Sequence, residues 1–177
     1  MAKNPSGSVW TIGHSNRSIE AFLNLLQHYK IKAVVDVRQF PGSRKYPHFN
    51  KENLSITLSE NNLQYIHLLE LGGRRKPNPD SPYTSWRHPA FRSYADYMDT
   101  DAFSEGIDML EKIALQQETA YMCSEAVWWS CHRSMISDYL KVRGWEVNHI
   151  LSPTKAELHP YTGPARIIDR KLSYLPG

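Results

Sequence analysis

The sequence predicts an α/β fold: a mostly parallel central sheet of about five strands with helices on both faces. Two observations support this class. Short apolar runs rich in β-branched residues alternate with longer segments whose apolar residues recur at helical spacing. Strands that alternate with helices form right-handed βαβ units, which place the strands parallel to one another. The chain has 177 residues, and we expect one domain over residues 1–177.

Five apolar runs have the length and composition of buried strands. Each is bounded by polar residues, glycine or a helical segment, as expected where a strand ends. The runs are VWTIG (9–13), KAVVDVR (32–38), QYIHLLEL (64–71), TAYMC (119–123) and WEVNHIL (145–151).

The segments between these runs carry helix signals. Ser18 and Asn50 stand where side chains cap the first turn of a helix. We also expect Ser130 to cap the helix before the fifth strand, and Gly144 to end it. Two further helical segments cover residues 90–98 and 100–117.

Two stretches lack a regular pattern. Residues 72–89 contain four prolines and two glycines and are too long for an ordinary connection, so they either order over another part of the protein or are mobile. Residues 152–177 show little periodicity, and we expect them to pack as a tail on the domain surface.

Composition and charge limit which ligands, and which cellular environment, we expect for the protein. The net charge is +3, which is mildly basic and fits an anionic small molecule or nucleotide, with nucleic acid as an alternative. No run approaches the ~18 apolar residues of a membrane span, and the first residues lack the apolar core of a signal peptide. Two cysteines cannot form a disulfide framework. We therefore expect a reduced, cytoplasmic protein without a membrane partner.

Ligands of parallel α/β sheets bind beyond the carboxyl ends of the strands. Polar residues and glycines follow four of the predicted strands, and we expect them to meet in one site. His14 and Ser15 come after the first strand. Asp36 and Arg38 end the second strand, with Ser43 and Arg44 after it. Gly72 and Gly73 come after the third strand, and Cys123 ends the fourth, with Glu125, Cys131, His132 and Arg133 after it.

Cys131 stands at the expected start of a helix. Helix amides, the helix dipole and the neighbouring His132 and Arg133 would lower the pKa of its thiol and favour the thiolate. The alternative is that the thiol only packs. Cys131, Met135 and Tyr139 are spaced as one helical stripe, and cysteine is often buried as a small apolar side chain.

Arg133 at a helix start, together with unpaired backbone amides, predicts an anion-binding position. An arginine there opposes the helix dipole, so we expect its partner to be a bound anion or a carboxylate such as Asp36 or Glu125. Gly72 and Gly73 either form part of a phosphate-binding turn or permit an unusual backbone angle.

Asp36 lies in an apolar strand, where a carboxylate must be paired. Arg38, two residues further along the expected strand, would pair with it only loosely. We therefore expect Arg44, Arg133 or His14 to be the partner of Asp36, either in a structural ion pair or as part of the site.

The two cysteines, His132 and His14 have enough donor atoms for a zinc ion. However, the cysteines stand eight residues apart, whereas structural zinc sites favour pairs two to four residues apart. We expect neither a metal nor a cofactor.

The motifs TIGHSN, VVDVRQFPGSR, YIHLLELGG, FRSYADYM and MCSEAVWWSCHRSMISDYL resemble those of the DUF488 family in order and spacing. The family comprises small bacterial and archaeal proteins of unassigned biochemical function. The resemblance covers nearly all of the chain. It implies an α/β fold and a shared polar set that falls on the site residues named above, but it implies no reaction.

Three functional interpretations follow. In the first, the protein is an enzyme: Cys131 or Cys123 attacks or Glu125 acts as a general base, His14 or His132 transfers protons, and the arginines hold a phosphate-bearing metabolite, nucleotide or nucleic acid. In the second, the arginines and tryptophans bind a nucleotide or nucleic acid without chemistry. In the third, the polar cluster is a structural network that fixes the core.

Overall fold

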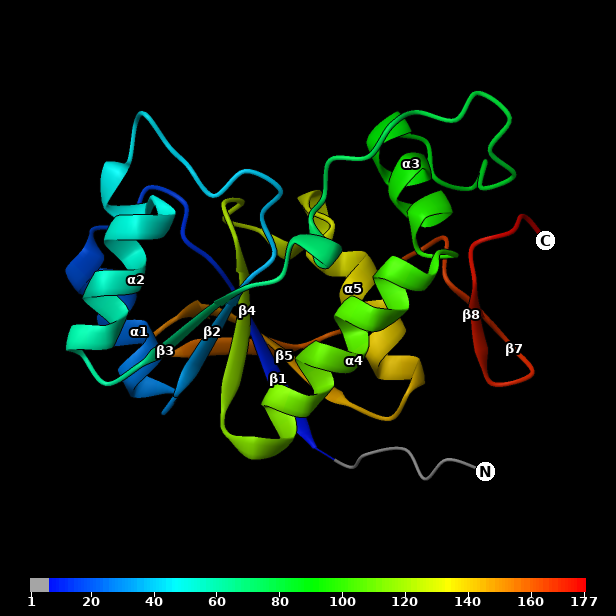
Figure 1. The fold of residues 1–177 in the computed structure, drawn as a ribbon. Helices are drawn as coiled ribbons and strands as arrows, with labels where there is room; N and C mark the ends of the chain where they lie inside the picture. The colour runs from blue at the N-terminus through cyan, green and yellow to red at the C-terminus, as the bar shows by residue number, and fades with distance from the viewer. Residues whose placement is uncertain (1–6) are drawn as a thin grey trace.

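A computed structural model describes residues 7–177, and its strands and helices alternate along the chain (Figure 1). The predicted α/β fold class is confirmed. The main sheet of the described residues has six strands rather than about five, in the order β3-β2-β4-β1-β5-β6. These strands are β1 (Ser8–Gly13), β2 (Ala33–Asp36), β3 (Gln64–His67), β4 (Thr119–Cys123), β5 (Glu146–Ser152) and β6 (Lys155–Leu158).

The helices cover both faces of this sheet. The α-helices are α1 (Ile19–His28), α2 (Lys51–Glu60), α3 (Pro89–Tyr97), α4 (Asp101–Gln116) and α5 (Arg133–Val142). Short 3₁₀ helices are η1 (Pro47–Phe49), η2 (Leu69–Leu71) and η3 (Trp128–Ser130). In Figure 1, α1 and α2 lie together on one side of the sheet and α4 and α5 on the other.

The strands β1 to β5 are all parallel, because β1 pairs in parallel with β4 and β5, and β2 with β3 and β4. Within the main sheet, β6 is the one strand that runs antiparallel to its neighbour, β5. The carboxyl ends of five strands therefore meet at one edge of the sheet, and the loops that leave β2 and β3 lie at that edge (Figure 1).

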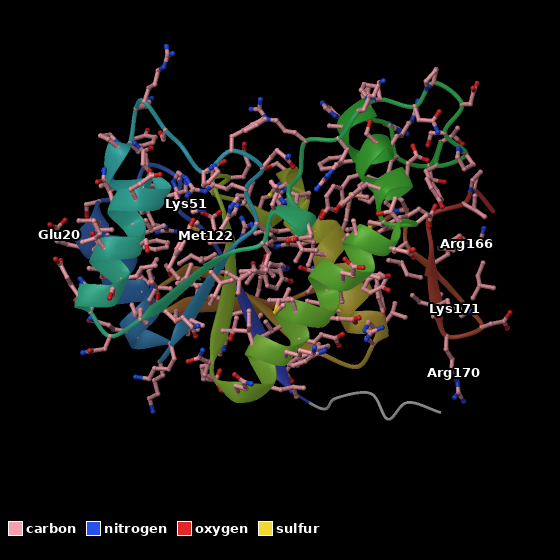
Figure 2. The ribbon with its side chains drawn as sticks, viewed as in Figure 1. Glu20, Lys51, Met122, Arg166, Arg170 and Lys171 are labelled. Carbon is pink, nitrogen blue, oxygen red and sulfur yellow. The ribbon has the colours of Figure 1, made fainter. Side chains whose placement is uncertain are left out.

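Side chains alternate between two cores, as the period of a strand requires. Ile12, Val34 and Met122 face the helices α1 and α2. Val35 and Tyr121, each one residue away from a member of the first set, face α3, α4 and α5. Figure 2 shows Met122 in the interior between the helices and the sheet.

The helix signals at Ser18 and Gly144 are confirmed, whereas Asn50 stands at the N-cap of α2 but makes no side-chain cap hydrogen bond, because its Oδ1 accepts the amide of Ser43. The hydroxyl of Ser18 accepts the amide of Ala21 at 3.1 Å, and Gly144 follows α5 with a φ of 98°. The expected cap at Ser130 is wrong, because this residue ends η3 and the N-cap of α5 is His132. The WWS segment forms its own 3₁₀ turn, which moves the start of the helix two residues along the chain.

The C-terminal residues do more than cover the surface. They supply β6 and a separate hairpin of β7 (Arg166–Ile168) and β8 (Lys171–Ser173). Figure 2 shows Arg166, Arg170 and Lys171 projecting from this hairpin, on the opposite side of the molecule from Glu20 on α1. Their anchor is a pair of buried side chains, His159 and Tyr174.

The irregular segment 72–89 is held by two aromatic side chains, Tyr83 and Trp86. Tyr83 packs against the core and donates its hydroxyl to Asp99. Trp86 is buried, and its ring lies 5.1 Å from the ring of Phe91 and 5.3 Å from the ring of Tyr174. The segment therefore orders over α3 and the C-terminal tail. Among residues 7–177, no helix combines the length and the apolar character that a membrane crossing needs.

Gly13, the last residue of β1, provides the first prediction. A Cβ atom there would lie 1.7 Å from the carbonyl oxygen of Glu125, so Gly13→Ala would force two backbone segments apart. We expect it to lower the free energy of unfolding by at least about 2 kcal/mol, measured by chemical denaturation. Gly163→Ala is the control, since nothing lies within 4 Å of the added atom. Equal stability of the two variants would contradict the close approach.

Candidate functional site

The carboxyl edge of the parallel strands encloses a pocket of about 1070 Å³. It lies where the sequence predicted a site, and most of the predicted residues line it. These are His14, Ser15, Arg38, Ser43, Gly73, Cys123, Glu125, Cys131 and His132.

Four of the predicted site residues do not line this pocket. Asp36 and Arg133 lie beneath its floor, with exposed fractions of 0% and 1%. Gly72 packs against Gln39. Arg44 is exposed and borders a separate hollow near the start of α2. The ends of β1, β2, β3 and β4 and the loops that follow them therefore bring nine of the predicted residues together around one pocket, but not Arg44.

The paired glycines are required by close packing rather than by backbone angle, since neither has a positive φ. A Cβ atom at Gly73 would lie 2.5 Å from Nδ1 of His132, and one at Gly72 would lie 2.3 Å from Oε1 of Gln39. The absence of a side chain at Gly73 lets the His132 ring sit against the pocket wall.

The two cysteines meet at the pocket floor. The sulfur atoms of Cys123 and Cys131 are 2.8 Å apart, and both residues are reduced and buried, with exposed fractions of 2% and 5%. Cys123 ends β4, whereas Cys131 follows η3 in extended backbone, with a φ of −140°. Cys131 precedes α5 and so is not part of a helical stripe, but it does pack in the same core cluster as Met135 and Tyr139. The backbone amide of Arg133 nevertheless donates to its sulfur at 3.5 Å.

The two thiols differ in acidity. Burial and the hydrogen bond that it donates to Cys131 raise the pKa of Cys123. Burial alone would also raise the pKa of Cys131, but the hydrogen bond from Cys123 and the charge of Arg133 lower it to about 7. About half of the Cys131 side chains are therefore thiolate at neutral pH. The expected direction of the shift is supported, and Arg133 is one of its causes.

Arg133 points away from the pocket and into the core. Its Nε donates to the sulfur of Cys123 at 2.9 Å, and its Nη2 donates to the carbonyl oxygen of Glu125 at 2.7 Å. Its Nη1 donates to the hydroxyl of Thr11 at 3.0 Å. The expected carboxylate partner is wrong, because Glu125 contributes its backbone and Asp36 pairs elsewhere. A buried guanidinium is thus balanced by sulfur, carbonyl and hydroxyl acceptors.

His132 is oriented by the backbone so that one ring nitrogen faces Cys131. Its Nε2 lies 2.8 Å from the carbonyl oxygen of Val37, which can only accept, so Nε2 carries the proton. Nδ1 then has a lone pair, 3.4 Å from the sulfur of Cys131. Burial lowers the pKa of His132, so the ring is neutral at pH 7. His132 therefore adds no positive charge to the thiol, contrary to expectation, but it can accept the proton of the thiol.

Asp36 pairs with Arg38, the arginine judged the weaker candidate. The carboxylate accepts Nε of Arg38 at 2.9 Å and Nη2 at 2.7 Å. The expectation failed because β2 ends at Asp36, so Arg38 is not held in extended strand geometry and its side chain folds back. Nη1 of Arg38 then reaches Nε2 of His14 at 3.4 Å. Burial lowers the pKa of His14 to about 4, so His14 is neutral.

A family model described as a domain of unknown function, DUF488, matches residues 18–140. The chain belongs to the DUF488 family. This finding agrees with the resemblance read from the motifs and gives no reaction. No match was found among curated proteins or among solved structures.

In this DUF488 protein, a chain of hydrogen bonds leads from Arg133 to residues beyond the matched span. Thr11 accepts Arg133, and its hydroxyl lies 2.6 Å from Nδ1 of His149. Nε2 of His149 lies 2.8 Å from Nδ1 of His159, and Nε2 of His159 lies 2.8 Å from Asp138. The direction is fixed at both ends, because arginine only donates and a carboxylate only accepts: Arg133 donates to Thr11, and Nε2 of His159 donates to Asp138. Burial lowers the pKa of His149, so that ring is neutral.

The C-terminal tail of the DUF488 protein holds Asp138 at the end of this chain of hydrogen bonds, which we call the relay. The carboxylate of Asp138 accepts the backbone amide of Thr162 at 3.0 Å, the hydroxyl of Thr162 and the hydroxyl of Tyr174 at 2.7 Å. The ring of Trp128 stacks on His149 at 4.5 Å and 6°. The sequence offered one signal for this relay, since Thr11 and His149 are polar residues inside apolar strands.

The rim of the pocket contains residues that sequence reasoning missed. The loops after β2 and β3 and the start of α3 supply cationic and aromatic side chains. These are Phe40, Lys45, Tyr46, Arg74, His88 and Phe91. Their signal was the dense basic and aromatic composition of QFPGSRKY and GGRRKP. The two cysteines and His132 lie together, but residues 7–177 contain no group of three or more His, Cys, Asp or Glu arranged to hold a metal ion.

Thr11→Val tests the relay. Valine keeps the shape of threonine but removes both hydrogen bonds of the hydroxyl, so a guanidinium nitrogen of Arg133 and Nδ1 of His149 lose a buried partner. We expect the free energy of unfolding to fall by about 2 kcal/mol in denaturant titrations. Thr154→Val, at an exposed turn, should change it by less than about 0.5 kcal/mol. A Thr11→Val protein as stable as wild type would refute the relay.

The neutral histidines predict a dependence of stability on pH. Burial lowers the pKa of His14 to about 4 and that of His149 to about 2. Between about pH 6.5 and 5 the unfolded chain therefore binds protons that the folded protein excludes, and stability must fall as the pH falls. Denaturation midpoints at several pH values measure this slope. The Cys131→Ser variant should retain it, and a flat profile would show that the histidines titrate normally.

Proposed function

We propose that the protein is an enzyme that acts on an anionic, phosphate-bearing substrate, with the thiolate of Cys131 as nucleophile. The observation that carries this proposal is the arrangement around the Cys131 sulfur. It lies on the floor of an open pocket, 3.4 Å from Nδ1 of His132 and 2.8 Å from the Cys123 sulfur. A nucleophile, an adjacent base and a group that orients the base form the usual arrangement of covalent catalysis.

The charge around the pocket supports an anionic substrate. The lining includes the cations Arg38, Lys45 and Arg74 and one carboxylate, Glu125. Arg38 is neutralised by Asp36, but Lys45 and Arg74 take no part in the ion pairs of residues 7–177. A substrate with a phosphate group would receive two positive charges at the rim while its other end reaches the thiol.

Each residue has a distinct role in this proposal. His132 takes the proton of Cys131, because its Nδ1 is unprotonated and the carbonyl oxygen of Val37 fixes the ring. The sulfur of Cys131 forms a bond to the electrophilic atom of the substrate as the bond to the leaving group breaks. The leaving group takes the proton from His132 or takes one from water. Arg133 is a positioning residue, because it stabilises negative charge on the sulfur pair from below.

The rim also favours a second candidate, a nucleotide-binding module without chemistry. The aromatic side chains of Phe40, Tyr46 and Phe91 line the same pocket as the cations. The guanidinium of Arg74 already lies 5.6 Å from the ring centre of Phe40. Stacking on aromatic rings and contacts to phosphate are the typical features of nucleotide recognition. In that case binding should survive the replacement of either cysteine.

Alkylation by iodoacetamide between pH 5 and 9 tests the proposal. We expect one thiol, Cys131, to react with a midpoint near pH 7, because the thiolate is the reactive form. A phosphate-bearing ligand should slow the reaction, so inorganic phosphate and a nucleoside monophosphate are added as probes. Mass spectrometry of peptides identifies the modified residue, and the Cys131→Ser variant should lose the fast phase.

The control variants distinguish ligand binding in the pocket from a general effect of the protein's charge on protection. Lys45→Ala combined with Arg74→Ala should abolish protection by the nucleoside monophosphate. Lys171→Ala removes a cation from the distant β7–β8 hairpin (Figure 2) and should leave protection unchanged. The proposal fails if Cys131 stays unreactive at pH 8 in the folded protein, or if all three proteins are protected equally.

A further inference from the structure

We propose that Cys123 and Cys131 are a site of reversible oxidation, in which a peroxide converts the two thiols into an intramolecular disulfide. This goes beyond the proposed function, because it needs no anionic substrate. It requires only that a small oxidant enters the pocket, which both sulfur atoms border.

The geometry of the reduced pair is close to that of the product. The sulfur atoms are 2.8 Å apart, and a disulfide bond measures about 2.05 Å. Closure therefore needs an approach of less than about 1 Å. Cys131 lies between η3 and α5, outside both helices, so its backbone can move without breaking a regular element.

The surroundings assign different roles to the two sulfur atoms. Cys131 accepts hydrogen bonds from the thiol of Cys123 and from the backbone amide of Arg133, so it carries the negative charge. Cys123 keeps its proton, and its sulfur contacts Nε of Arg133 at 2.9 Å. Cys131 is thus the thiol that attacks the oxidant. Cys123 is the resolving thiol, because Arg133 stabilises its charge when the proton leaves.

The chemistry balances in two steps. The thiolate of Cys131 attacks one oxygen of the peroxide ROOH, the O–O bond breaks, and Cys131 becomes a sulfenic acid while RO⁻ takes a proton and leaves as ROH. The sulfur of Cys123 then attacks the sulfur of Cys131. The S–S bond forms, the S–O bond breaks, and the hydroxyl leaves as water with the proton of Cys123. Two thiols are oxidised and one peroxide is reduced.

The enclosure of the pair favours the disulfide over other products. Cys131 is 5% exposed, so an external thiol or a second oxidant reaches its sulfenic acid poorly, whereas Cys123 is already in contact with it. Oxidation would also remove the thiolate that the proposed reaction needs. A peroxide would therefore switch the proposed enzyme off, and a dithiol reductant would restore it.

The experiment treats the whole protein with one equivalent of hydrogen peroxide at pH 7, then unfolds it and alkylates the remaining thiols. We expect mass spectrometry to show a monomer that has lost two hydrogens and takes up no label, and dithiothreitol to restore both labels. Cys131 should react about tenfold faster than an ordinary cysteine, since its thiolate fraction is larger by about that factor. In Cys123→Ser the sulfenic acid at Cys131 should persist and be trapped by dimedone. In Cys131→Ser the fast reaction should disappear.

Several results would overturn the inference without touching the proposed function. Cys131 could proceed to a sulfinic acid in wild-type protein while Cys123 still takes up label, or the disulfide could join two chains. These outcomes are measured on wild-type protein and do not depend on the folding of a variant. Protection from alkylation by a nucleoside monophosphate remains a separate result, so disulfide formation without protection would reject only the proposed function.

Discussion

The fold around the site depends on one buried charge, the guanidinium of Arg133. Moving a cation into the interior costs several kcal/mol unless acceptors surround it. Here the acceptors come from three separate parts of the chain: Thr11 in β1, Cys123 at the end of β4, and the carbonyl oxygen of Glu125 in the following loop. The same contacts that make the burial of Arg133 tolerable also lower the cost of negative charge on the paired sulfur atoms. Stability and the proposed reactivity at this edge of the sheet therefore share one cause.

The relay behind Arg133 keeps this charge apart from that of Asp138. Three hydrogen-bonding side chains, Thr11, His149 and His159, stand between the two, so the carboxylate does not contact the guanidinium directly. The positive charge of Arg133 then remains available to stabilise negative charge on the Cys131 sulfur. A structural network and a reactive site are often treated as competing explanations for a polar cluster. In this protein the buried network and the proposed reactive site occupy adjacent parts of one continuous set of hydrogen bonds.

Much of the fold and part of the site could be predicted from the sequence. The alternation of apolar runs and amphipathic segments indicated the parallel sheet, and the rule that ligands bind at carboxyl ends placed nine of the predicted residues around one pocket. The predictions that were wrong concern local geometry. The pairing of Asp36 with Arg38 depends on where β2 stops, and the inward direction of Arg133 depends on an extra turn at WWS. Neither is encoded in spacing. His159 lies in a tail without periodicity, so only its tertiary partners reveal its role.

The position of β1 in the sheet limits which fragments of the chain can fold by themselves. The span that matches the family begins at residue 18, yet β1 lies between β4 and β5 and forms the centre of the sheet. A fragment trimmed to residues 18–140 would lose β1, β5 and the tail that holds Asp138. It would leave the backbone of β4 unpaired along one side, and such an edge promotes aggregation. The smallest unit of this chain that can fold by itself is thus larger than the span, residues 18–140, that matches the family model.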